Sequence, residues 1–106
     1  MKKGAIYKIS SEEYAALAQE VCAKLISPSY FSGTVEISSP TGEESLRLTA
    51  SLIIYRRKPK HFDSQDEGDT IEHIVAVWWD FMCEDEDGLL EDDFDFERFE
   101  EAMREI

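Results

Sequence analysis

The residues in this chain with the clearest potential for chemistry are two histidines and a large number of carboxylates. His73 lies in the most apolar run of the chain, residues 70–82. His61 is followed by three aspartates, Asp63, Asp66 and Asp69. Histidine can serve as a general base or as a metal ligand near neutral pH. A dedicated zinc site, however, needs three or four rigidly held ligands. The polar segment 59–69 offers no such rigidity, so we predict no metal site there.

Sequence motifs for catalysis or calcium binding are missing or incomplete. There is no Gly-x-Ser-x-Gly turn, no glycine-rich phosphate loop and no Cys-x-x-Cys pair. A calcium loop with Gly88 in its sixth place would need carboxylates where Cys83 and Phe94 stand. We therefore predict no catalytic residue, no cofactor and no metal. An enzyme that uses His73 or the carboxylates of segment 59–69 is the weakest alternative.

The charge of the chain is strongly negative and unevenly distributed. The formal net charge is −13, and residues 80–106 hold 13 of the 24 acidic residues but only two of the 11 basic ones. Direct binding to nucleic acid or to an anionic membrane needs a positive surface. This distribution argues against both and favours a partner protein with a basic surface.

The length and composition predict one folded domain spanning residues 1–106. Hydrophobic residues make up 42% of the chain, enough for a core in a domain of this size. No apolar run approaches the length of a membrane span, and residues 4–10 are too short and polar for the apolar part of a signal peptide. We expect a cytoplasmic protein. Two cysteines, Cys22 and Cys83, do not form a disulfide scaffold.

Two helices are predicted, one near each end of the chain. Ser10 and Glu13 have the spacing of a capping box, and the apolar stripe that follows continues until Pro28, which should stop the helix. The second helix begins after Asp93 or Asp95. Its apolar stripe has helical spacing and consists of Phe96, Phe99, Met103 and Ile106.

Alternating apolar residues predict strands at 34–38, 46–58 and 70–82, with a further short strand within 5–9. Residues 83–93 have the composition of an acidic connector. We therefore predict an α+β two-layer sandwich built as a helix, a three-stranded antiparallel meander and a second helix.

The predicted order of elements resembles that of double-stranded-RNA-binding domains. Those domains carry lysines at the start of the last helix. Here the corresponding positions are acidic, namely Asp92, Asp93, Asp95 and Glu97. The reversed charge indicates a shared outline without the RNA-binding function.

Two adjacent tryptophans, Trp78 and Trp79, should point to opposite faces of their strand. We expect Trp78 to be exposed on the sheet face away from the helices, together with Ile53, Tyr55 and Ile74. An exposed apolar patch of this kind marks a partner-binding surface or a homodimer interface.

These observations lead to a small, acidic, non-catalytic interaction protein: an adaptor, a chaperone or an immunity-type inhibitor that recognises a basic partner. The alternative is a nucleic-acid mimic whose carboxylates block a DNA-binding protein. The predicted partner-binding residues come from the sheet and from the acidic quarter of the chain: Ile53, Tyr55, Trp78, Asp92, Asp95, Glu97, Glu100 and Glu101.

Overall fold

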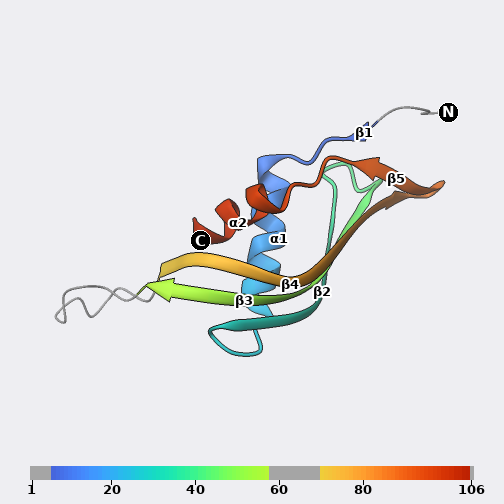
Figure 1. Ribbon diagram of the computed structural model, residues 1–106. Helices are drawn as coiled ribbons and strands as arrows, with labels where there is room; N and C mark the ends of the chain where they lie inside the picture. The colour runs from blue at the N-terminus through green and yellow to red at the C-terminus, as the bar shows by residue number, and fades with distance from the viewer. Residues whose placement is uncertain (1–5, 58–69, 106) are drawn as a thin grey trace.

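The computed structural model describes residues 6–57 and 70–105 and shows one five-stranded sheet with two helices (Figure 1). The elements in chain order are β1 (Ile6–Tyr7), α1 (Ser11–Ala23), β2 (Tyr30–Ser38), β3 (Ser45–Arg57), β4 (Thr70–Asp85), β5 (Gly88–Asp92) and α2 (Phe96–Arg104). The strand order is β1-β5-β4-β3-β2. All neighbouring strands are antiparallel except β1 and β5, which are parallel.

The predicted α+β class is correct, but the predicted three-stranded antiparallel meander is wrong. The chain reverses after β4 and returns as β5, and β1 then pairs beside β5 to make a mixed sheet of five strands. The reversal is a tight hairpin in which Asp85 faces Gly88, whose φ of 124° is accessible to glycine at low cost. Residues 83–93, predicted to be an acidic connector, are therefore largely strand. Acidic residues are tolerated in β5 because many of its side chains are exposed.

A single hydrophobic core lies between the helices and one face of the sheet. From the sheet it takes side chains such as Leu46, Leu48 and Leu52, all with no exposed surface. From the helices it takes fully buried residues including Leu17, Val21, Phe99 and Met103. Both helices thus cover the same face, and the opposite face has no covering layer among the described residues (Figure 1).

The start of α1 follows its local sequence closely. Ser10 Oγ accepts a hydrogen bond from the amide of Glu13, and Glu13 Oε1 accepts one from the amide of Ser10, which confirms the predicted capping box. Glu13 is buried, and its other carboxylate oxygen is satisfied there because it accepts a hydrogen bond from the Tyr7 hydroxyl. Burial, and then this hydrogen bond, raise the pKa of Tyr7. The helix ends at Ala23, before Pro28 is reached.

The segment between β5 and α2 is tied to the N-terminal part of the chain. Asp93 Oδ1 accepts a hydrogen bond from the amide of Ile9 at 2.9 Å, and the Tyr14 hydroxyl accepts one from the amide of Asp95 at 2.8 Å. Phe94, between these two aspartates, stacks on Phe81 with 4.3 Å between ring centroids. These contacts fix where α2 begins, and Asp95 is its N-cap, one of the two residues predicted for that role.

The alternation of side chains along β4 is interrupted twice. Opposite β3, the register skips Val77 between Trp78 and Ala76, and it skips Glu72 between His73 and Ile71. Each skipped residue forms a β-bulge, which changes the face on which the following residues lie. The expectation that Ile74 shares the exposed face of Trp78 is therefore wrong: Ile74 is 3% exposed and lies in the core.

Candidate functional site

The face of the sheet away from the helices carries a row of apolar side chains. Tyr30 of β2, Ile53 of β3 and Val75 of β4 are direct neighbours across the three strands. The residues that flank them in each strand, such as Phe31 and Ile54, are buried on the helix side. Alternation therefore places the row on the sheet face away from the helices, which we call the open face. There Tyr30 and Val75 are exposed and Ile53 is half-buried.

Further exposed apolar side chains extend this row on both sides. Trp78 lies opposite Ser51 and is 52% exposed, and the bulge residue Val77 beside it is 62% exposed. Tyr55 is exposed and stacks on the imidazole of His73. We call the whole surface the open-face patch; it consists of Tyr30, Ile53, Tyr55, Val75, Val77 and Trp78.

The two tryptophans have different surroundings. Trp79 packs towards the helices, with ring centroids 5.2 Å from Phe94 and 5.7 Å from Phe96, although 41% of its surface is exposed. No aromatic contact involves Trp78 among the described residues. Trp78 is therefore the more exposed of the two, whereas Trp79 helps to hold α2 against β4.

The other end of the open face is mostly polar, although Leu89 of β5 is 71% exposed there. Arg47 lies between two carboxylates on the neighbouring strands, 3.6 Å from Glu36 and 3.7 Å from Glu84. The hydroxyl groups of Thr34 and Thr49 are hydrogen-bonded at 2.9 Å. Exposed ion pairs of this kind contribute little stability. They do limit the open-face patch to one end of the sheet and give it a polar border.

The predicted carboxylates divide into two groups. Asp92, Asp95 and Glu100 bind backbone amides of their own chain, those of Phe94, Glu97 and Ile74 respectively. Burial raises the pKa of Asp92 despite the opposing effect of its hydrogen bond.

Glu97 and Glu101 of α2 form the second group, since both are exposed. Asp95 is exposed as well, but one of its oxygens caps α2.

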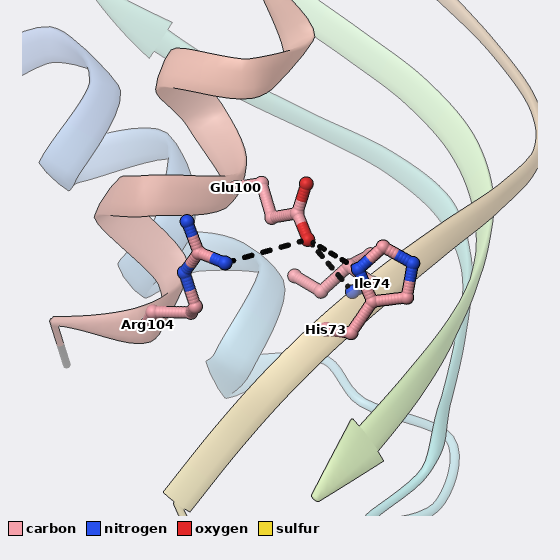
Figure 2. Close-up of polar contacts among 4 residues, drawn as sticks. All are labelled: His73, Ile74, Glu100 and Arg104. Carbon is pink, nitrogen blue, oxygen red and sulfur yellow. Dashed lines mark hydrogen bonds and ion pairs between the residues drawn. The ribbon is translucent and has the colours of Figure 1, made fainter.

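Glu100 is the centre of a polar cluster between α2 and β4 (Figure 2). Its Oε2 atom lies 3.0 Å from the amide nitrogen of Ile74, 3.0 Å from Nδ1 of His73 and 3.9 Å from a guanidinium nitrogen of Arg104. The side chain of Glu100 is only 12% exposed, whereas that of His73 is 58% exposed. The sequence indicated an acidic helix face but carried no signal that Glu100 would bind the edge of a strand.

A carboxylate that orients a histidine is also an arrangement used in catalysis. Such a mechanism needs a nucleophile or a bound water beside the other ring nitrogen. Within residues 6–57 and 70–105, no serine, threonine or cysteine hydrogen-bonds to His73. The cluster fastens α2 to β4, because Glu100 contacts both the amide of Ile74 and the side chain of His73.

The other histidine and its neighbouring aspartates, His61, Asp63, Asp66 and Asp69, lie outside the described residues. Within the described part of the chain, no group of three histidine, cysteine, aspartate or glutamate side chains is arranged to hold a metal ion. The same residues contain no helix long and apolar enough to cross a membrane.

The surface of the described residues is hollowed in at least two places. One, of about 490 Å³, lies between α1 and α2, where the Arg98 guanidinium stacks over the Tyr14 ring. The other, of about 360 Å³, lies between two hairpin turns and is lined by acidic residues including Glu43 and Glu86.

Comparisons of this chain with protein-family models, curated proteins and solved structures found no match.

Proposed function

We propose that this chain is a small non-catalytic protein-interaction module, of the adaptor, chaperone or immunity-inhibitor kind, that binds a basic protein. The open-face patch would make the central contact. The observation that supports this most directly is that five of its six apolar side chains are exposed side by side on a sheet face without a covering layer in the described residues. Contiguous exposed aromatic and aliphatic groups with a polar border are typical of partner-binding surfaces.

The charge of the chain supports a basic partner. With a net charge of −13, the protein would attract a positive surface over several ångströms and accelerate the encounter at low salt. The exposed carboxylates Glu97 and Glu101 would contribute to this attraction, whereas Trp78 and its neighbours would form the desolvated centre of the contact.

The nucleic-acid mimic has less support. Mimicry needs carboxylates along one continuous exposed surface, like phosphates along a strand. Asp92, Asp95 and Glu100 instead bind backbone amides of their own chain. Each of these three carboxylates therefore has one oxygen engaged within its own chain, which fixes its orientation toward that chain and not toward a partner. A cytoplasmic location remains a proposal made from the sequence.

A pull-down with this chain as bait, from a lysate of the cells in which it naturally occurs, tests this proposal at low and at high salt. The wild-type chain should retain a basic protein at low salt and release most of it at high salt. Trp78→Ser should abolish retention, because it removes the largest exposed group of the patch. Glu97→Lys combined with Glu101→Lys should weaken retention at low salt.

The matched control is Glu43→Lys combined with Glu86→Lys, which changes the net charge equally at two exposed hairpin turns far along the sheet from the patch. Retention by this control should stay closer to that of the wild type. If Trp78→Ser retains the same protein as the wild type, the open-face patch is not the binding surface.

A further inference from the structure

Among the described residues, the outer edge of β4 has a neighbouring strand at one end only. Its inner edge pairs with β3 over almost its whole length, but on the outer side β5 pairs only with residues 83–85. No strand among the described residues pairs with the outer edge along residues 71–82. Typical strands have about five or six residues, so this edge is long enough for a complete additional strand.

The orientation of the backbone at this edge is shown by Glu100. Because its carboxylate accepts a hydrogen bond from the Ile74 amide, that N–H group points away from β3 (Figure 2). Residues two apart in an antiparallel strand have the same backbone orientation, so Ala76 also presents its N–H and C=O groups outward. Glu100 thus occupies one position that the carbonyl of an added strand would take.

The usual protection of an exposed edge is incomplete here. Natural edge strands often carry lysine or proline, which discourage further pairing. β4 contains neither in its sixteen residues. Its backbone is protected at Ile74 by the Glu100 side chain, a contact that an incoming strand could replace with hydrogen bonds of its own.

The charge of β4 indicates which strand would fit. The strand carries four acidic residues and no basic residue; of the four, Asp80 lies in the stretch that β5 leaves unpaired, whereas Glu84 and Asp85 lie where β5 pairs. A second copy of this chain would bring the same acids to the edge, together with a net charge of −13. A strand with alternating lysine or arginine would meet opposite charges, and opposite charges across strands are favourable.

We propose that the outer edge of β4 binds an extended, basic segment of the partner protein as an additional β-strand. The partner class rests on the proposed function, but the mode of binding is a separate claim. An added strand would lie directly beside Val75, Val77 and Trp78, so it would continue the open-face patch. The bulge at Val77 adds twist to the edge, which a flexible segment can follow more easily than a folded second copy.

The test is calorimetric titration of the full chain with a capped eight-residue peptide of alternating lysine and valine. Two analogues are compared with it, one methylated on every lysine backbone nitrogen and the other on every valine backbone nitrogen. All three peptides have the same charge and side chains. A strand added to an edge donates the N–H groups of one alternate set only. The parent should bind, and one analogue should bind at least about tenfold more weakly, since it has lost every hydrogen bond that its N–H groups would donate to the edge.

Equal binding of all three peptides would overturn strand addition, yet the partner capture described above could still succeed. No binding of the parent peptide would also overturn it. Dimerisation of the chain through this edge would overturn the choice of occupant. Sedimentation would then give twice the mass of one chain for the wild type and the mass of a single chain for Ala76→Pro.

An independent variant, Ala76→Pro, removes an outward N–H without removing a bond to β3. It should weaken the parent peptide about tenfold while the variant remains folded. If the variant does not fold, the methylated peptides still decide the question with the wild-type chain.

Discussion

The two faces of the same three strands, β2, β3 and β4, have opposite characters. On the covered face, Leu46, Leu48 and Leu52 have no exposed surface. On the open face, Tyr55, Val77 and Trp78 are each more than half exposed. The covered face supplies the hydrophobic stabilisation of the fold, so the open face is left available for binding. The difference can be tested with neighbouring residues that share a strand but not a face.

The largest difference is expected between Leu52→Ala and Ile53→Ala. Leu52 is fully buried beneath the helices, and its truncation should lower the free energy of unfolding by about 2–5 kcal/mol. Ile53 is half-buried on the open face, so its truncation should cost less than about 1.5 kcal/mol. Urea denaturation of both variants measures the difference. Equal losses would show that the open face is covered in solution.

The two tryptophans provide a second comparison. Trp79→Ala removes contacts with Phe94 and Phe96 and should destabilise the fold by about 1–3 kcal/mol. Trp78→Ala should cost less than about 1 kcal/mol, since Trp78 is exposed. The same denaturation measurement applies. A larger loss for Trp78 than for Trp79 would reverse our assignment of the two faces.

Alkaline pH should weaken the covered face selectively. Burial, together with neighbouring carboxylates such as Asp92 and Glu44, raises the pKa of Cys83 from its ordinary value of 9.0 to about 11. Between these values the unfolded chain loses the thiol proton while the folded chain keeps it. The stability contributed by this group is therefore complete below about pH 9 and is lost as the pH rises through about 11.

The urea midpoint should accordingly fall between pH 9 and pH 11, the range set by these pKa values. Cys83→Ala should show a shallower fall, because it removes the thiol. Tyr7, whose pKa is also raised, should account for part of the remainder. An identical pH dependence in the variant and the wild type would exclude a contribution from Cys83.

The smallest effect is expected from Asp92→Asn. Burial raises the pKa of Asp92, so its charged form is disfavoured in the folded state, and Asn can still accept the hydrogen bond from the Phe94 amide. The variant should be more stable at pH 7 by less than about 1 kcal/mol. Its advantage should disappear at acidic pH, where the wild-type carboxyl is protonated in both states. Thermal unfolding at the two pH values measures this, and a destabilised variant at pH 7 would contradict it.

Features that depend on short stretches of sequence could be predicted. The Ser10 and Glu13 capping box placed the start of α1, and the spacing of Phe96, Phe99 and Met103 indicated α2. β5 was missed because its acidic residues have low strand preference. The Asp87-Gly88 pair, a strong hairpin signal, was present where β5 begins.

Features that depend on contacts between distant segments could not be predicted. The bulges at Glu72 and Val77 arise from the register of β4 against β3. The alternation of apolar residues within β4 alone does not reveal this register. The bond between Glu100 and Ile74 joins residues that meet only after α2 packs against the sheet. The predicted patch was therefore correct in placing Trp78 on the exposed side and wrong in including Ile74.

The most direct test of the open face as a binding surface uses the two indole N–H signals in proton–nitrogen correlation spectra of the wild-type chain. Each tryptophan gives one signal, and the basic protein retained at low salt is the titrant. We predict that the Trp78 signal shifts or broadens on titration while the Trp79 signal remains in place. A response confined to Trp79, or none from either tryptophan, would contradict the assignment of the open-face patch as the partner-binding surface.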